Sequence, residues 1–334
     1  MLRNMNTKLN VAAAVDLESL DLLAKEFRRQ FDISTDVIHE RLSGRRFVFN
    51  RDGKDTYPFD DWEAGDGEAL PLEPFDEVVT VASTDSSCIL LGETSDSSVY
   101  AVRAAVCFAS GGIVRGYFRI GPMVVHLSSQ GAIGLPMLLE GYELRVALSD
   151  HLIAERIIRN SIEKRILASL LNFPQRMVVV ADGSLKHPLE TSPDLLFHEG
   201  ESGSALVGVS KTSALISSNR MSGVVSRAKG PAYAPVEDGL VSTLLAKFSK
   251  DGLVFRVDLA RCRGRVGQTL GTIVSNDNFS AGYPESLRVA HHLSVFSRSE
   301  DMALKAYLTN RYSLKQLRSF GLRRIALGGL SNSG

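Results

Sequence analysis

The sequence predicts an α/β fold in which an antiparallel meander of strands is followed by a long helix and further strands. Between residues 78 and 127, short runs of β-branched and apolar residues recur with glycine-containing turns between them, as in successive strands. From Leu144 to Leu171 the chain has a helical pattern without Pro or Gly. The apolar run at Met177–Leu185 then predicts a buried strand that ends in a turn, Asp182-Gly183-Ser184.

Residues 1–74 are expected to form a helical extension that precedes the main domain, residues 75–334. The first helix of the extension has apolar residues spaced by three or four positions. Its apolar side, around Leu20–Phe31, is a candidate contact for a dimer or for another partner. The expected elements are helices at Leu17–Phe31 and Asp32–Leu42, a short strand at Arg46–Phe49 and a long acidic loop at Asp52–Pro74.

The first strand of the main domain is expected to end at an aspartate. The strand signal at Val78–Ala82 is followed by Ser83-Thr84-Asp85-Ser86-Ser87, whose small polar residues would leave the carboxylate of Asp85 at the strand end. The meander that follows has expected turns at Gly111-Gly112 and Gly121-Pro122. Its expected strands are Cys88–Gly92, Val99–Ala109, Ile113–Ile120 and Val124–Leu127.

The second half of the domain repeats this association of a strand with a polar turn. Asp182 follows a valine-rich strand, and open α/β sheets carry their chemistry at the carboxyl ends of central strands. The alternative is that Asp182-Gly183-Ser184 is an ordinary turn. The other expected elements are strands at Ala205–Val209, Gly252–Ala260 and Gly267–Ser275, a loop at Ser217–Pro235, and helices from Tyr283 through Ser294, at Met302–Tyr312 and at Leu314–Phe320.

The composition indicates a globular protein of a reducing compartment. The chain has 334 residues, of which 44% are hydrophobic, and its three cysteines allow neither a disulfide framework nor a CxxC metal pair. No stretch approaches the roughly 20 apolar residues of a membrane span, and the N-terminus has no clear signal-peptide region. We therefore expect a cytoplasmic protein without a membrane segment.

Charge is distributed unevenly along the chain, although the formal net charge is zero. No Lys or Arg lies between Lys54 and Arg103, and no Asp or Glu follows Asp301. This segregation could provide a basic surface for phosphates and an acidic surface for metals or a partner. It could equally provide two solvated faces that attract each other. The net charge argues against a generic basic coat for nucleic acid.

The carboxylates predict a site for divalent metal ions. Asp85 and Asp182 each follow a strand, and the long helix carries Glu155 and Glu163, which can also be read as surface residues paired with Arg159. Mg²⁺ and Mn²⁺ prefer carboxylate oxygens, and two ions about 4 Å apart would activate a water and stabilise the leaving oxygen of a phosphodiester. The motifs of P-loop ATPases, zincins and α/β-hydrolases are absent from the sequence.

Five motifs occur in a fixed order along the main domain. They are V-A-S-T-D-S-S-C-I-L-L-G-E-T at Val81–Thr94, Y-A-V-R-A-A-V at Tyr100–Val106, V-V-V-A-D-G-S-L at Val178–Leu185, V-G-V-S-K-T-S at Val207–Ser213 and G-Y-P-E-S-L-R-V-A-H at Gly282–His291. With these motifs in this order, the sequence resembles the NurA family of DNA-end-processing nucleases from about Phe75 to Ser299. The resemblance implies an RNase H-like mixed sheet, an antiparallel meander plus parallel strands, flanked by helices.

The resemblance also implies which residues bind metal. Asp85 and Asp182 match the two aspartates that bind metal in the family, and His291 matches a late histidine that either binds the second metal or holds the scissile phosphate. The helix glutamate of the family falls on Glu163, with Glu155 as the alternative.

Two further residues have roles implied by the resemblance. Tyr283 matches a Tyr-Pro pair and would orient a phosphate or a water. Lys211 matches the S-K-T-S turn and would pair with a phosphate of DNA. Because His292 directly follows His291, the histidine assignment is uncertain by one position.

As function, the resemblance implies DNA cleavage with Mn²⁺ or Mg²⁺, two ions in all, by 5′→3′ exonuclease and single-strand endonuclease activity. It places this activity in DNA end resection and double-strand break repair, in a homodimer that works with a hexameric HerA-type ATPase. Two alternatives stay open. One is a non-catalytic subunit on the same fold that binds DNA or the ATPase, and the other is an RNase H-like nuclease that acts on RNA.

Overall fold

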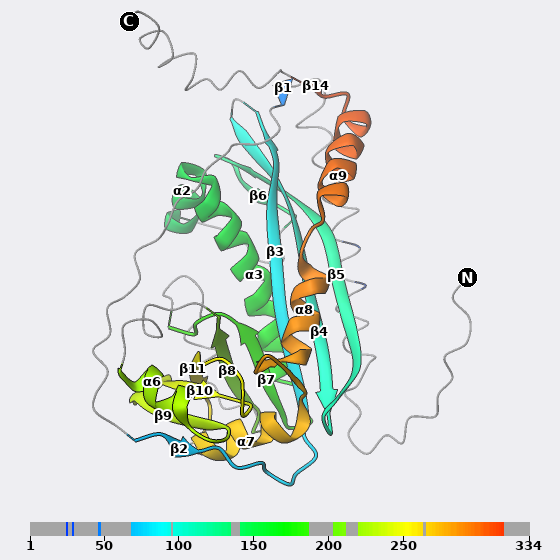
Figure 1. The fold of residues 1–334 in the computed structure, drawn as a ribbon. Helices are drawn as coiled ribbons and strands as arrows, with labels where there is room; N and C mark the ends of the chain where they lie inside the picture. Colours follow the sequence, from blue (N-terminus) through cyan, green and yellow to red (C-terminus); the bar gives the residue numbers. More distant parts are fainter. Residues whose placement is uncertain are drawn as a thin grey trace, which may run out of the picture.

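The chain forms a central mixed sheet covered by helices on both faces (Figure 1). Helix α3 (His151–Leu171) packs on one face, and α7 (Val266–Asn276) and α8 (Glu285–Ser294) pack on the other. No helix in the described part of the chain is long and apolar enough to span a membrane. The computed structural model describes residues 25, 29, 46–47, 68–94, 96–134, 141–186, 203–211, 220–262 and 265–316.

The main sheet has ten strands in the order β2-β9-β10-β11-β8-β7-β3-β4-β5-β6. Strands β3, β4 and β5 form an antiparallel meander, β7 runs parallel to β3, and β8 runs parallel to β7. This arrangement confirms the expected RNase H-like sheet flanked by helices. The strands are β2 (Leu70–Pro71), β3 (Thr80–Glu93), β4 (Ser97–Ser110), β5 (Ile113–Ser128), β6 (Gly131–Ile133), β7 (Met177–Asp182), β8 (Ala205–Ser210), β9 (Ala232–Glu237), β10 (Ser242–Lys247) and β11 (Phe255–Ala260).

The remaining elements lie outside this sheet. Two short pairs are formed by β1 (Arg46–Phe47) with β14 (Lys315–Gln316) and by β12 (Phe279–Ser280) with β13 (Tyr283–Pro284). Among the described residues, further helices are α2 (Gly141–Ser149), α6 (Arg220–Arg227) and α9 (Arg298–Arg311).

Strand β7 is buried on both faces of the sheet, which explains its run of valines. Val178 and Val180 belong to the core under α7 and α8, whereas Val179 belongs to the core under α3. Each of these side chains is nearly or completely buried, and burial of one valine stabilises the fold by about 1.5–3 kcal/mol. A strand that is buried on both sides has no polar face, so its sequence is continuously apolar.

Two strands are longer than the sequence predicts. Asp85 does not end a strand but lies in the middle of β3, where it pairs with Ala105 of β4. The small polar residues around it continue the strand because β4 pairs with them along its whole length. Gly121-Pro122, the expected turn, lies inside β5 at an irregularity in its pairing with β4. Pro cannot donate a ladder hydrogen bond, and an irregularity removes the need for one.

Two helical segments also differ from the expectation. The predicted single helix Leu144–Leu171 is broken into α2 and α3 at Asp150, whose carboxylate accepts hydrogen bonds from the first backbone N–H groups of α3. The predicted strand Gly267–Ser275 is helix α7. Its Leu270 and Ile273, three positions apart, are both buried in the core of the sheet. This helical spacing of apolar residues outweighs the β-branched residues that predicted a strand.

Further corrections concern an expected loop and an expected C-terminal helix. The expected loop Ser217–Pro235 contains α6 and most of β9, and the first described residues of the expected helix Leu314–Phe320 include the short strand β14. Lys25 and Arg29 are helical, while the other positions of the two predicted N-terminal helices and most of the acidic loop lie outside the described residues. Strand β2, from the predicted extension, pairs with β9, and the division at residue 74 stays a prediction.

Helix α8 is fixed to the sheet at both ends. At its beginning, the buried carboxylate of Asp277 accepts hydrogen bonds from the backbone and side chain of Ser286, and Ser286 Oγ lies 2.5 Å from Ser83 Oγ of β3. After its end, the buried guanidinium of Arg103 on β4 donates to the carbonyl of Val295 and, at 2.7 Å, to Glu300 of α9.

The ion pair between Arg103 and Glu300 predicts an acid-dependent loss of stability. The hydrogen bond from Arg103 lowers the pKa of Glu300 to about 2, below the value of about 4.3 in an unfolded chain. The contribution of the pair is therefore complete above about pH 5 and is lost as the pH falls towards 2. In urea denaturation at pH 7, Glu300→Gln is expected to cost about 1 kcal/mol, because the glutamate is 37% exposed and solvent screens the pair.

The matched control is Asp301→Asn, which removes an ion pair with Lys305 within α9 and leaves Arg103 untouched. It is expected to cost about 0.5 kcal/mol or less. If the difference in free energy of unfolding between wild type and Glu300→Gln stayed the same from pH 7 to pH 2, the stabilising role of the Arg103–Glu300 pair would be wrong.

Candidate metal centre

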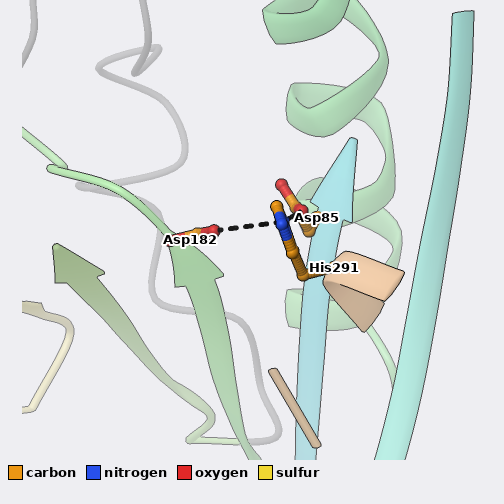
Figure 2. A group of neighbouring side chains, drawn as sticks. All are labelled: Asp85, Asp182 and His291. Carbon is orange, nitrogen blue, oxygen red and sulfur yellow. Dashed lines mark hydrogen bonds and ion pairs between the residues drawn. The ribbon is translucent and has the colours of Figure 1, made fainter. Parts of the chain in front are cut away.

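Three potential metal ligands converge from three elements of the fold. Asp85 comes from β3, Asp182 from the end of β7 and His291 from α8, and Figure 2 shows their side chains pointing toward one another. One ligand atom of each residue lies within 4.8 Å of the others. Nδ1 of His291 is 2.7 Å from Oδ2 of Asp85 and 3.8 Å from Oδ2 of Asp182. Asp85 is buried, and the other two are partly exposed.

Strand register explains why the two aspartates meet. Strands β3 and β7 are parallel, and Thr84 pairs with Ala181, so the next residues, Asp85 and Asp182, lie side by side. Alternate residues of a strand share a face, and Val180 places Asp182 on the side of α7 and α8. Helix α8 lies on this face, which brings His291 to the pair.

Asp85 is held by hydrogen bonds on both carboxylate oxygens. The backbone N–H of Ser86 donates to Oδ1 at 2.8 Å, and Ser294 Oγ donates to Oδ2 at 3.1 Å. Nδ1 of His291 lies 2.7 Å from the same Oδ2 and donates to it in the tautomer that has a proton on this nitrogen. Ser294 follows His291 by three residues on α8, so one helix face supplies two of these donors. The sequence reasoning missed Ser294, and its only signal was this spacing.

Asp182 is flanked by a cation and a phenol. Lys211, the last described residue before residue 220, donates from Nζ to Oδ2 at 2.8 Å, and Tyr283 donates from its hydroxyl to Oδ1 at 3.1 Å. The ammonium also lies 4.9 Å from the centre of the Tyr283 ring. Burial, followed by the negative charge of Asp182, raises the pKa of Tyr283 well above its ordinary value, so the phenol stays protonated and acts as a donor.

The two candidate glutamates occupy different places along α3. Glu163 accepts a hydrogen bond from Ser86 Oγ, beside Asp85, and its carboxylate is 3.8 Å from Arg159. Glu155 accepts from the backbone N–H of Leu90 at 2.8 Å, and burial raises its pKa. Glu163 is therefore the glutamate nearer to the three converging residues, although it is not one of them. Its role as a metal ligand stays a prediction.

The turn after β7 is supported by a buried carboxylate that sequence reasoning missed. Asp258 of β11 is completely buried and accepts hydrogen bonds from Ser184 Oγ at 2.6 Å and from the backbone N–H of Leu185 at 3.0 Å. Gly183 in this turn has a positive φ of 115°, a conformation that favours glycine. A Cβ on Gly208 of β8 would lie 2.6 Å from the carbonyl oxygen of Gly183. The tight turn thus fixes the backbone that carries Asp182.

The chemistry of this donor set fits a divalent cation. Two carboxylates within ligand distance of each other repel when both are ionised, and in the structure the ammonium of Lys211 offsets part of that repulsion. Carboxylate oxygens with one imidazole suit Mn²⁺, and carboxylate oxygens suit Mg²⁺. Asp85, Asp182 and His291 are the residues that would hold such an ion.

Comparison with known proteins finds only low similarity, and the similar solved structures include nucleases. No protein-family model matches the chain, and no curated protein matches its sequence. Among solved structures, the NurA nuclease from Sulfolobus solfataricus is 12% identical, with a TM-score of 0.45 over 73% of this chain and 88% of that one. A NurA bound to dAMP and manganese is 10% identical, with a TM-score of 0.45 over 89% of this chain and 98% of that one.

The catalytic domain of human endonuclease V is also similar in structure, at 14% identity and a TM-score of 0.35 over 89% of this chain and 99% of that one. These values are too low to assign the chain to a family. The function proposed below therefore depends on the geometry of the site.

Metal binding at the converging residues predicts a rise in thermal stability. Because Mn²⁺ would bind the folded chain, a concentration one hundred times its Kd should add about 2.7 kcal/mol to the stability of the wild type. Asp85→Asn, Asp182→Asn and His291→Ala should lose this increase in calorimetry. Full stabilisation of Asp182→Asn by Mn²⁺ would contradict the site.

Two further substitutions separate the candidate glutamates in the same measurement. Glu163→Gln is expected to reduce the effect of Mn²⁺, whereas Glu155→Gln, whose amide oxygen can still accept from Leu90, is expected to keep it. Glu77→Gln is the charge-matched control, because Glu77 pairs with Arg176 away from the three converging residues.

The buried support under the turn predicts a large loss of stability for Asp258→Asn. This change replaces an acceptor of four hydrogen bonds, including one from Arg256, by an amide that cannot accept on both sides. We expect a loss of about 3–5 kcal/mol in urea denaturation. Thr243→Val removes only one of the four donors and should cost about 1 kcal/mol. Equal losses for the two variants would contradict this role of Asp258.

Proposed function

We propose that this chain is a metal-dependent nuclease that hydrolyses phosphodiester bonds at the site formed by Asp85, Asp182 and His291. The observation that carries the proposal is the convergence of two carboxylates and an imidazole within 4.8 Å, from two adjacent parallel strands and one helix. A lysine ammonium and a protonated tyrosine lie directly beside them. Carboxylates and an imidazole that can hold a divalent cation, beside a lysine that can pair with a phosphate, suit metal-assisted reactions of phosphates.

The residues of the site divide the work according to their surroundings. A divalent cation bound by the carboxylates would lower the pKa of a water and neutralise charge on the phosphate. When a divalent cation neutralises the carboxylate of Asp182, the exposed ammonium of Lys211 can leave it and pair with a phosphate oxygen. Tyr283 orients Asp182 through its hydroxyl, and Ser294 orients Asp85. Both serve to keep the two carboxylates in place for metal.

The motifs that resemble the NurA family support a more detailed proposal. The substrate is DNA, cut by 5′→3′ exonuclease and single-strand endonuclease activity with Mn²⁺ or Mg²⁺, and two ions take part. The protein acts as a homodimer with a HerA-type ATPase in the resection of DNA ends, in the cytoplasm. In this proposal Glu163 completes the metal ligands and Lys211 contacts a phosphate of the DNA.

A cleavage assay on end-labelled single- and double-stranded DNA tests the proposal. We expect degradation with Mn²⁺ or Mg²⁺, none with EDTA, and at least about a hundredfold lower rate for Asp182→Ala, because loss of a single catalytic group commonly costs that much. A matched RNA strand in the same assay separates the proposed substrate from the alternative one.

The control variant is Glu77→Gln, which should cleave like the wild type. Absence of cleavage in every metal, with DNA binding retained, would overturn the proposal in favour of a non-catalytic subunit. Equal cleavage by wild type and Asp182→Ala would show that the activity comes from elsewhere.

A further inference from the structure

One strand of the sheet carries an exposed row of basic and aromatic side chains. In the first half of β5 every second residue is exposed, and the residues between them are partly buried. Tyr117 is 59% exposed, which is high for a tyrosine in the body of a strand. Arg119, two residues further on, lies on the same face of the strand, and Arg115 is exposed beside Tyr117 at an irregularity in the pairing of β5 with β4. We name Arg115, Tyr117 and Arg119 the β5 row.

The β5 row faces the same side of the sheet as the candidate metal centre. Tyr117 pairs with Cys107 of β4 and Arg119 with Ala105, and both β4 residues pack against Ala290 of α8. Ala105 in turn pairs with Asp85. Because neighbouring strands lie about 4.8 Å apart, the backbone of Arg119 is about 10 Å from that of Asp85.

Helix α8 stands between the row and the metal centre. His291 points to Asp85 on one flank of the helix, while Val289 and Leu293 pack toward β4 and β5 on the other. Figure 1 shows β5 running beside α8, on the side away from β7. A chain that crosses the exposed back of α8 would therefore connect the row with the metal centre. A helix is about 10 Å across, a distance that a few nucleotides span.

The row lies on an edge of the sheet. In the described part of the chain, β5 pairs with β6 only from His126 onward, so the segment that carries the row has β4 as its single neighbour. Charged side chains on such an edge discourage pairing with another strand, which would account for the two arginines. It does not account for the exposed aromatic ring between them, because an exposed ring favours association.

We propose that the β5 row binds a single strand of nucleic acid, with the two arginines on phosphates and Tyr117 stacked on a base. Positive charge matches the backbone of the ligand, and an exposed ring offers the stacking surface that unpaired bases use. Bases in a duplex are already stacked, so the row selects single strands. This inference extends the proposed function and rests on it in one respect. The nuclease proposal implies that the bound nucleic acid continues from the β5 row over α8 to the carboxylates.

Anisotropy of a labelled thymidine oligonucleotide in EDTA tests the row without cleavage. Tyr117→Ala should weaken binding by about 5- to 100-fold, while Tyr117→Phe, which keeps the ring, should bind like the wild type. The double variant Arg115→Ala/Arg119→Ala should weaken binding and lower the slope of log affinity against log salt by about 1.4. A blunt hairpin duplex should lose much less affinity with Tyr117→Ala than the oligonucleotide does.

Two matched controls come from other surfaces of the protein. Tyr307→Ala removes an exposed aromatic ring from α9, and Arg227→Ala removes an exposed guanidinium from α6. Both should bind the oligonucleotide like the wild type. Unchanged binding by Tyr117→Ala would overturn the proposal. If that variant instead changes the oligomeric state in gel filtration with binding unchanged, the row is a contact between copies of the chain and the proposal is wrong.

Failure of this inference is separable from failure of the proposed function. Metal-dependent cleavage by the wild type together with unchanged binding by the row variants would refute the proposed role of the β5 row and leave the proposed nuclease function standing. Loss of binding in the row variants without cleavage in any metal would refute the nuclease and keep the row as a binding surface.

Discussion

The parallel pairing of β3 with β7 is the contact on which the candidate site depends. It places Asp85 beside Asp182 on one face of the sheet, and two carboxylates so close repel each other unless a cation or a proton compensates. The ammonium of Lys211 provides part of this compensation in the structure. The repulsion between the two carboxylates destabilises the fold, and the same concentrated negative charge attracts a divalent cation.

The surroundings of the pair restrict how far the two carboxylates can move apart. Asp258 fixes the turn after Asp182 from beneath, and hydrogen bonds from Ser86 and Ser294 fix Asp85. Helix α8, which carries His291, is fixed at its beginning through Asp277 and after its end through Arg103. Buried, satisfied polar groups of this kind give a site a single geometry, so that binding a cation requires little rearrangement.

Local sequence patterns predicted much of the fold, and the motifs that resemble a nuclease family pointed to the candidate site residues. The valine-rich run before Asp182 predicted a strand that is buried on both faces. The long segment without Pro or Gly predicted the helical region that contains α3, and the turn at Gly282-Tyr283-Pro284 predicted the beginning of α8. Asp85, Asp182 and His291 were singled out from the sequence and lie together in the structure. Their function as metal ligands is a proposal, which the sequence and the geometry support independently.

Other features were decided by tertiary structure, because they depend on which segments become neighbours. Asp85 lies within a strand since β4 pairs along the whole of β3, a partner that the local pattern does not contain. Residues 267–275 form a helix because their apolar side chains reach the sheet only at helical spacing. Asp258 supports a turn 74 residues earlier in the chain. The sequence by itself determined which chemical groups this protein possesses, and only long-range packing decided which of them meet.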